Sequence, residues 1–585
     1  HGRRFIHILL PPPTAGPVRR RSPLPPAPTG PPDMPALPRA AIVLLLACSA
    51  AGPALAEEPL HTRIDALVAA GHPGYEKQAA PVASDAEFLR RADLDLNGTI
   101  PTAAEVRAFL ADTDPAKREQ LIDQLLASPA YARWMAQFFD VVLMERRRDN
   151  KVPRAAWEEY LRSAFAANRP YDEFVRELLS ADGSDPKTRP AAKFFLDRDF
   201  EPNLVTRDIG RVFLGRNMQC AQCHDHPIVA DYKQADYYGL LAFLNRSSLF
   251  PNPNAANAVI VEKADGEVNF VSVFDKAKKQ GTTFPRVPGG KPIEDPPSEK
   301  GTDTKPAPAA PATKLAPAPP TPPRPPAYSR RAQLAKAVTS PENPAFARTA
   351  ANRFWAMMLG RGLVHPLDLD HPGNPPSHPE LLDLLAKEFA DHQFDMKWLL
   401  REIALSKTYQ RSSEVPAGLS DMPPDRYLVA NLKPLSAEQL AYAVFQATGT
   451  TDAERAALGK NPTEAALDAK LAPRLAPFRA TFGGQPGAPD TGITTTLDQT
   501  LFLKYGQAVR GLIAPRAGNL TDRLAKLSDP GEVADELFVS VLSRPPTAEE
   551  RKDVIELLKL SADRPAAVNE LVWALLASAE FRFNH

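Results

Sequence analysis

Two adjoining segments carry most of the information in this sequence: Leu204-Val205-Thr206-Arg207-Asp208-Ile209-Gly210-Arg211-Val212-Phe213 and, shortly after it, Cys220-Ala221-Gln222-Cys223-His224-Asp225-His226. In the first segment, apolar residues recur at the three- and four-residue spacing of an amphipathic helix. The second segment gathers thiols and imidazoles, the side chains that bind metals and haem. The first segment therefore predicts the helical fold, and the second predicts the chemistry.

Helical patterns occur on both sides of the chain's centre. Leu60, Ile64, Leu67 and Val68 form one apolar face near the start, and a similar face lies at residues 381–389. The helix starts carry capping signals, in which Ser or Thr is followed three residues later by Glu or Gln. These pairs are Thr102 with Glu105, Ser377 with Glu380, and Ser436 with Gln439. The sequence predicts a mainly α protein.

Between the helical parts, two short β-type runs flank a turn. Val259-Ile260-Val261 and Val268-Asn269-Phe270-Val271 surround Ala264-Asp265-Gly266, which predicts a β-hairpin. Residues 285–327 are then rich in Pro, Ala, Lys and Thr, a composition typical of an extended linker. We therefore expect two helical domains, at 57–250 and 328–585, joined by the hairpin insertion and the Pro-rich linker of residues 251–327.

Two polar segments invite functional interpretations that we do not favour. Asp93-Leu94-Asp95-Leu96-Asn97-Gly98 is similar to the start of a calcium loop, but Ala104 stands where such a loop needs a bidentate Glu. We expect a turn there, followed by the helix that Thr102 caps. The run Glu145-Arg146-Arg147-Arg148-Asp149 is predicted to form a solvated face.

Composition limits the class of protein. The chain has 585 residues, 43% of them hydrophobic, with 70 Lys and Arg against 70 Asp and Glu. This zero formal charge gives no reason to expect nucleic acid as a partner. The length suits two or three domains, and the composition does not predict an oligomeric state.

The N-terminal part predicts export. Residues 1–33 are rich in Pro and Arg and are expected to be a disordered or untranslated extension. The pattern of a secretory signal peptide begins at Met34. A positively charged residue is followed by the apolar run Ala40–Ala51 and by the small-residue cleavage site Ala54-Leu55-Ala56. Lipoprotein processing at Cys48 is a less favoured alternative. No later stretch is long and apolar enough to predict a transmembrane helix.

Cys220, Cys223 and His224 form C-x-x-C-H, the pattern for covalent attachment of haem c. Each thiol can form a thioether to the porphyrin, and the imidazole of His224 can bind the iron from one face. Its other ring nitrogen can then donate to a carbonyl or carboxylate, which sets its tautomer. After cleavage at Ala56 these are the two cysteines left, which excludes a disulfide framework and strengthens the haem interpretation.

Other interpretations stay open at these residues. Cys220, Cys223, His224 and His226 could instead hold zinc or another transition metal, with the help of a remote ligand. The thiols could also form a short disulfide or pack in the core. The aromatic residues downstream, including Tyr232 and Tyr238, are predicted to be core rather than the wall of a cofactor site.

A haem bound by His224 would have a second axial position. Met218 and His226 are too close to His224 in the sequence to reach round a porphyrin. The remaining candidates are Met135, Met144, His365, His371, His378 and His585. His365, His371 and His378 lie in a Pro/Gly-rich loop with two aspartates, so a separate metal or substrate cluster is an alternative for that loop.

Long motifs in both halves resemble those of the planctomycete cytochrome-c-like family of exported proteins. In the first half they are Phe213-Leu214-Gly215, Cys220 through Pro227, and Tyr237-Tyr238-Gly239. In the second half they are Ser340 through Pro344, Asn352 through Trp355, Gly360 through Val364, Asn374 through Glu380, and Glu580 through His585. The resemblance implies an N-terminal domain with the Cys-His signature and its usual partner domain, both of unknown function.

Three functions follow from these observations. The favoured one is an exported c-type haem protein that passes electrons, with a redox partner protein, or takes part in haem-linked oxidation. The second is an exported enzyme with a non-haem metal, acting on carbohydrate or another extracytoplasmic substrate. The third is a cell-surface structural or binding protein. Whether the chain is an enzyme stays open at this point.

Overall fold

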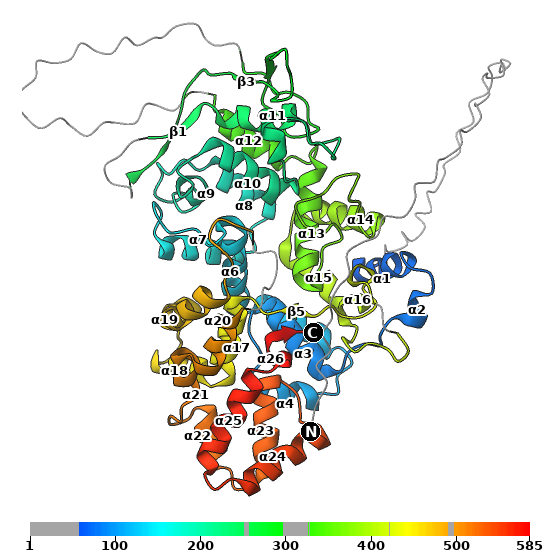
Figure 1. Cartoon of the computed structure of the whole chain (residues 1–585), viewed down its shortest axis with the longest axis vertical. Helices are drawn as coiled ribbons and strands as arrows, with labels where there is room; N and C mark the ends of the chain where they lie inside the picture. The colour runs from blue at the N-terminus through cyan, green and yellow to red at the C-terminus, as the bar shows by residue number, and fades with distance from the viewer. Residues whose placement is uncertain (1–57, 251–256, 297–325, 327, 420–421, 490–495) are drawn as a thin grey trace, which may run out of the picture. The chain divides into compact units, whose positions relative to one another are not determined.

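Short amphipathic helices account for most of the chain in the computed structural model, which confirms the prediction of a mainly α fold (Figure 1). The structure describes residues 58–250, 257–296, 326, 328–419, 422–489 and 496–585. The expected N-terminal extension and signal peptide lie outside these residues.

The helices that precede the Pro-rich segment are α1 (Leu60–Ala70), α2 (Tyr75–Gln78), α3 (Asp85–Leu96), α4 (Ala103–Ala111), α5 (Lys117–Ala127), α6 (Pro129–Met144), α7 (Arg154–Ala166), α8 (Tyr171–Ser180), α9 (Lys193–Leu196), α10 (Pro202–Leu214), the 3-10 helix η1 (Cys220–Gln222) and α11 (Gln234–Leu244).

The helices that follow it are α12 (Arg330–Val338), α13 (Pro344–Leu359), α14 (Pro379–Asp391), α15 (Met396–Leu405), α16 (Lys407–Gln410), the 3-10 helix η3 (Pro424–Arg426), α17 (Ala437–Ala447), α18 (Thr450–Ala457), α19 (Glu464–Phe482), α20 (Leu497–Tyr505), α21 (Gln507–Ile513), α22 (Leu520–Lys526), α23 (Pro530–Leu542), α24 (Ala548–Leu560), α25 (Arg564–Leu576) and α26 (Ala579–Arg582).

Local sequence explains where these helices start. Two of the three predicted capping boxes form, at Thr102 and Ser436. In each, the hydroxyl accepts from the backbone N–H three residues later, and the side chain of that later residue accepts from the backbone N–H of the cap residue. The predicted cap at Ser377 is wrong. Helix α14 has Pro379 at its first position, which makes His378 the N-cap residue, and no side-chain cap bond forms there.

The hydrophobic core is shared between the two halves of the sequence. Phe139 lies 6.0 Å from Phe354, and Tyr171 stacks on Phe346 at 5.4 Å, in each case between ring centroids. This first core draws on buried residues from α1 to Leu428, while a second core is built mainly from residues 435–581. The predicted domain boundary at the Pro-rich segment stays a prediction, since residues 297–325 lie outside the described part of the chain.

The predicted β-hairpin at residues 259–271 is wrong in its pairing, although strands form at both places. β2 (Ile260–Glu262) pairs with β1 (Ser247–Leu249), and β3 (Val268–Phe270) pairs with β4 (Gly281–Thr283). The buried guanidinium groups of Arg246 and Arg330 both donate to the carbonyl of Gly266. Because buried donors need acceptors, the carbonyl of the expected turn is engaged by these arginines, and each strand pairs with another partner.

A buried carboxylate joins segments that are far apart in the sequence. Asp95 on α3, which is 2% exposed, accepts hydrogen bonds from Lys433, Tyr409 and Asn584. Lys433 and Asn584 belong to the two-stranded pair of β5 (Lys433–Pro434) and β6 (Phe583–Asn584). The aspartates of the calcium-like motif therefore lie on a helix, and Asp95 is used to hold the C-terminal strand.

Two buried arginines of α3 also bond to segments that come late in the sequence. Arg90 donates to the carbonyls of Val541 and Phe581, at 3.2 and 3.0 Å. Arg91 donates to the carbonyl of His585 at 2.9 Å and to that of Tyr409 at 2.6 Å. The carbonyls of late segments therefore satisfy donors of a helix near the N-terminus.

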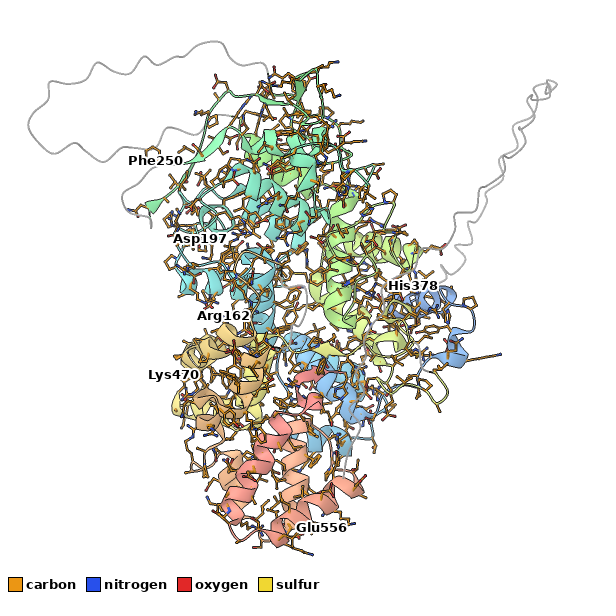
Figure 2. The ribbon with its side chains drawn as sticks, viewed as in Figure 1. Arg162, Asp197, Phe250, His378, Lys470 and Glu556 are labelled. Carbon is orange, nitrogen blue, oxygen red and sulfur yellow. The ribbon has the colours of Figure 1, made fainter. Side chains whose placement is uncertain are left out.

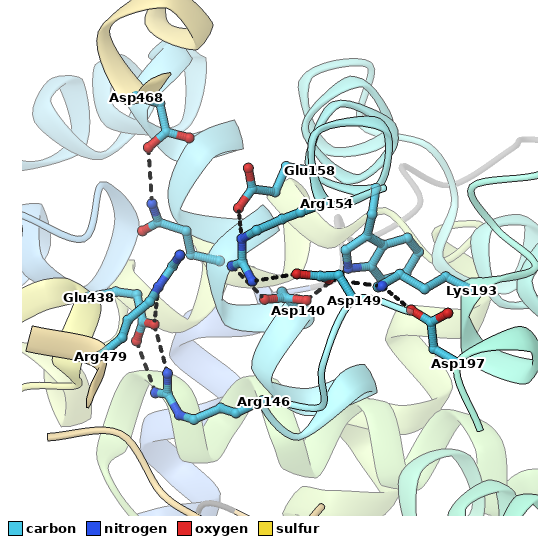
Figure 3. A network of polar contacts seen from close by, with 12 residues as sticks. Asp140, Arg146, Asp149, Arg154, Glu158, Lys193, Asp197, Glu438, Asp468 and Arg479 are labelled. Atoms are coloured by element: carbon cyan, nitrogen blue, oxygen red, sulfur yellow. Dashed lines mark hydrogen bonds and ion pairs between the residues drawn. The ribbon is translucent and has the colours of Figure 1, made fainter. Parts of the chain in front are cut away.

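The charge run that follows α6 differs from the predicted solvated face in its first part: Glu145 is buried and Arg146 and Arg147 are half-buried, while Arg148 and Asp149 are exposed. Glu145 is 3% exposed, and Arg146 makes a bidentate ion pair with Glu438 on α17, at 2.9 and 3.1 Å (Figure 3). Arg479 on α19 also donates to Glu438 at 2.9 Å. The run faces other helices that supply opposite charges, a pairing that local sequence does not reveal.

The pKa of Glu438 reflects this environment. Burial alone would raise it, but the hydrogen bonds and positive charge of Arg146, together with the charge of Arg479, lower it to about 2. A carboxylate whose folded-state pKa is depressed stabilises the fold above its unfolded pKa. That contribution is lost as the pH falls through the folded-state pKa.

We expect Glu438→Gln to lower the free energy of unfolding by about 3 kcal/mol at pH 7 and by only about 1 kcal/mol at pH 3, because the unfolded glutamate is then already protonated. Urea unfolding at both pH values checks this. Glu173→Gln, at an exposed position, is the control and should change stability by less than about 0.5 kcal/mol. An equal loss for Glu438→Gln at both pH values would contradict the ion-pair assignment.

Candidate functional site

The Cys-His segment follows directly from helix α10. The helix begins with Pro202 at its first position and ends at Gly215, whose φ of 62° favours glycine. A Cβ at Gly215 would lie 2.8 Å from the hydroxyl oxygen of Thr349, so the close approach of α13 also requires glycine here. Met218 and Ala221, 1% and 0% exposed, then anchor the next turn in the core.

Cys220 and Cys223 lie at the two ends of one tight turn. The N–H of Cys223 donates to the carbonyl of Cys220 at 3.2 Å, which closes the 3-10 turn of η1. Both side chains are exposed free thiols, while Ala221 between them is buried. The turn therefore presents both sulfur atoms at the surface, which is what attachment to an external group requires.

His224 has a defined tautomer. Its Nδ1 lies 2.6 Å from the carbonyl oxygen of Asp225. Because a carbonyl oxygen only accepts, Nδ1 carries the proton and Nε2 keeps its lone pair. The ring also contacts Phe274, with ring centroids 4.6 Å apart. His224 thus has the tautomer that a metal-binding imidazole needs at Nε2.

His226 has the opposite arrangement. Its Nδ1 accepts from the backbone N–H groups of Ile228 and Val229, at 3.2 and 2.9 Å. An accepting Nδ1 places the proton of the neutral ring on Nε2, and the lone pair that could bind a metal is engaged by these two backbone N–H groups. The geometry favours a structural role for His226 as the cap of its own turn.

Side chains and backbone from both sides hold the Cys-His turn. The buried Gln234 donates from its side chain to the carbonyl of Gln222, at 3.4 Å, and to that of Val271, at 3.3 Å. The hydroxyl of Tyr238 also donates to the Gln222 carbonyl, at 3.0 Å. The N–H of Val273 donates to the carbonyl of Cys223 at 3.1 Å. The segment after β3 therefore lies against the turn.

Several large apolar side chains around this turn are exposed to solvent. Ile228 is 88% exposed, Phe274 74%, Val273 66% and Val271 40%. Exposed apolar side chains gathered at one place mark a surface that binds something. We call these four residues the apolar face; Val273 bonds to the carbonyl of Cys223, and Phe274 contacts the ring of His224.

A loop of the second half docks beside the same turn. The N–H of Asn217 donates to the carbonyl of Asp368 at 2.7 Å, and the N–H of Asp370 donates to that of Gly215 at 3.0 Å. The ring of Tyr232 lies between two histidines, with centroids 5.8 Å from His226 and 5.5 Å from His371. The structure thus brings together two motifs that lie far apart in the sequence.

Tyr232 is buried, and its hydroxyl donates to the carbonyl of Asp370 at 3.4 Å. Burial raises its pKa, with a smaller opposing effect from Arg216. The phenol therefore stays neutral over the physiological range and remains a hydrogen-bond donor to the docked loop.

The candidates for a second axial ligand lie in different surroundings. Met135 and Met144 are buried in the first core, at 0% and 1% exposure. His378, labelled in Figure 2, is buried with its ring against Tyr427, and burial lowers its pKa. Of the loop histidines, His371 contacts Tyr232 and so adjoins the Cys-His segment. A second axial ligand stays a prediction.

No group of three or more His, Cys, Asp and Glu side chains converges as a metal site within the residues that the structure describes. Cys220, Cys223, His224 and His226 therefore do not form a closed ligand set, and the acidic loop with His365, His371 and His378 does not form one either. Zinc as a cofactor at the Cys-His turn stays a prediction. In the same part of the chain, none of the helices combines the length and apolar character needed to cross a bilayer.

Sequence reasoning missed two parts of this surface. The first is the segment Val271–Phe274, which follows the expected hairpin strand and lies against Cys223 and His224. The sequence signal for this surface is an apolar run that continues past the strand into a lysine-rich loop. The end of an ordinary strand would be expected to be polar. The second is the docking of the loop at residues 365–371 through Asp368 and Asp370: its histidines were candidates from the sequence, but these contacts depend on long-range packing.

Comparison with protein families divides the chain at the Pro-rich segment. Residues 63–248 match the family described as PSCyt2, protein of unknown function (DUF1549). Residues 330–558 match the family described as PSD1, protein of unknown function (DUF1553). These matches agree with the two-part arrangement that the sequence resemblance implies, and neither description names a cofactor. No curated protein and no solved structure matches the chain.

We expect both thiols of the haem-free, reduced protein to react with Ellman's reagent without denaturant, because Cys220 and Cys223 are exposed. Protein that begins at Glu57 should release two equivalents of chromophore per chain. Cys220→Ser and Cys223→Ser should each release one. Thiols that react only after urea is added would contradict the exposed arrangement.

Proposed function

We propose that the chain is an exported c-type haem protein with an electron-transfer or other haem-linked redox role. The observation that carries the proposal is the turn at residues 220–224. It presents two exposed thiols and, directly after them, an imidazole whose Nε2 lone pair is available. Such a turn meets the chemical requirements of C-x-x-C-H attachment.

The surroundings of the turn suit a flat, largely apolar group. The apolar face supplies four side chains that would lose contact with water on binding, at about 25 cal/mol for each Å² of apolar surface buried. A bound c-type haem would supply the one-electron chemistry of its iron.

The residues of this chain would hold and orient the bound group. Cys220 and Cys223 would hold the group covalently, and His224 would direct Nε2 at it. The carbonyl of Asp225 keeps the proton on Nδ1, and Gln234 and Tyr238 fix the turn through the carbonyl of Gln222. Val273 and Phe274 would exclude water from one side.

Export supports the same interpretation. The signal-peptide pattern from Met34 to Ala56 predicts export, and c-type haem is attached outside the cytoplasm in bacteria. The non-haem metal alternative has less support, because the Nδ1 lone pair of His226 is engaged by backbone N–H groups and the described residues supply no converging set of three donors.

Protein produced with a cytochrome maturation system should keep a haem stain after denaturing electrophoresis and should give the pyridine haemochrome spectrum of haem c. Cys220→Ser and Cys223→Ser should each abolish stable double attachment, because each thiol forms its own thioether. Gln222→Ala, which lies between them and leaves both thiols in place, is the matched control and should stain like wild type. An unstained wild-type protein would refute the proposal.

His224→Ala and His226→Ala separate the roles of the two histidines. We expect His224→Ala to change the Soret band and the spin state of the attached haem, because the Nε2 ligand is lost. His226→Ala should lower stability while keeping the wild-type spectrum, because His226 caps a turn. Optical and electron paramagnetic resonance spectra of both variants check this, and the reverse result would exchange the two assignments.

A further inference from the structure

Three lysines extend the apolar face along the chain. Lys276, Lys278 and Lys279 lie in the loop between β3 and β4, and all three are exposed. Among the described residues, none of them pairs with a carboxylate. Three positive charges therefore lie within four residues, with the carboxylate of Asp275 as the one negative charge of the same turn.

The backbone of this loop is well defined. The carboxylate of Asp275 accepts from the N–H groups of Ala277 and Lys279, at 2.9 and 3.0 Å, which closes a tight turn. Just before it, Val273 donates to the Cys223 carbonyl, and Phe274 contacts the ring of His224. The turn thus places the lysines next to the Cys-His segment.

Most of the neighbouring acidic groups already have partners. Asp225 lies 3.5 Å from the ammonium of Lys233, and Asp236 pairs with Arg286 at 3.0 Å. Asp275 is occupied by the backbone of its own turn. Asp231 is the remaining exposed carboxylate of the 225–236 segment. The loop therefore keeps a net positive charge.

We propose that the apolar face and the lysines of residues 276–279 form the docking surface for an acidic electron-transfer protein. The inference rests on the proposed function, because electrons would enter or leave at the group held by Cys220, Cys223 and His224. The lysines would steer an acidic surface toward the site, and the surface of Ile228 and Val271 that the bound group leaves exposed would form the desolvated centre of the contact. One electron would pass between the two redox groups, and no covalent bond would form or break.

An anionic membrane is the other class of partner that such a loop fits, since apolar residues with lysines also bind acidic lipids. The position of the loop favours the protein partner. Its backbone bonds to the Cys-His turn itself, so whatever docks there comes next to the redox group.

The first test is independent of haem. Carbodiimide joins a lysine amine to a carboxylate as an amide, with loss of water, and so records close ion pairs. With flavodoxin as an acidic one-electron probe, we expect cross-links at Lys276, Lys278 and Lys279 that disappear in about 0.5 M salt, because screening weakens exposed pairs. Cross-links spread evenly over exposed lysines, including Lys470 of Figure 2, would overturn the proposal.

The second test measures electron transfer. The triple variant Lys276→Gln, Lys278→Gln, Lys279→Gln should reduce the rate from flavodoxin hydroquinone to the haem by about ten-fold at low ionic strength, because steering is lost. The matched control, Lys460→Gln, Lys470→Gln, Lys559→Gln, removes the same charge from exposed positions on other parts of the chain. Equal slowing in both triple variants would overturn the local docking surface.

The outcomes separate the two proposals. Wild-type protein without a haemochrome spectrum but with the localised cross-links would refute the proposed function and leave the acidic-partner surface standing. Haem-bearing protein without localised cross-links would refute the docking surface alone. Cosedimentation with phosphatidylglycerol vesicles that depends on Lys276, Lys278 and Lys279, without cross-links to flavodoxin, would replace the protein partner with a membrane.

Discussion

A charge buried in a protein has to be matched by donors or opposite charges, and this constraint determines which parts of the chain meet. Asp95 on α3 is satisfied by Lys433, Tyr409 and Asn584, three residues from the second half. Glu438 on α17 is satisfied by Arg146, which follows α6, and by Arg479 on α19. Removing one partner of such a set leaves a buried charge at a cost of several kcal/mol. The arrangement of helices is therefore specified by polar pairs as well as by the apolar core.

The same need for hydrogen-bond partners applies to the backbone of the candidate site. The Cys-His turn has no regular structure of its own beyond η1, so its carbonyls and N–H groups are bonded by neighbours such as Gln234, Tyr238 and Val273. The loop that contains Asp370 and His371 closes it from the second half. The family match that covers residues 330–558 thus belongs to a part of the chain that supports the site of the first half, which gives a physical reason for the two parts to occur together.

Helices and caps could be predicted from sequence because they depend on residues within one or two turns. The capping boxes at Thr102 and Ser436 are examples, and the tautomer of His224 follows the expected bond to a carbonyl. Long-range pairing could not be predicted. The strands at residues 260 and 268 pair with other partners because Arg246 and Arg330 bind the turn between them. Likewise, the first residues of the charge run after α6 turn away from solvent because their partners come from distant helices: Arg146 pairs with Glu438, and Glu145 pairs with Arg211.

The arginines of α3 set an order for events during synthesis. Arg90 and Arg91 are buried and donate to the carbonyls of Phe581 and His585. Asp95 accepts a hydrogen bond from Asn584, which lies 489 positions later in the sequence. A nascent chain that carries α3 alone has no means of satisfying these groups away from water. The final packing of these early helices therefore requires residues that are synthesised last. If the chain follows the proposed export route, this dependence places its final packing after translocation.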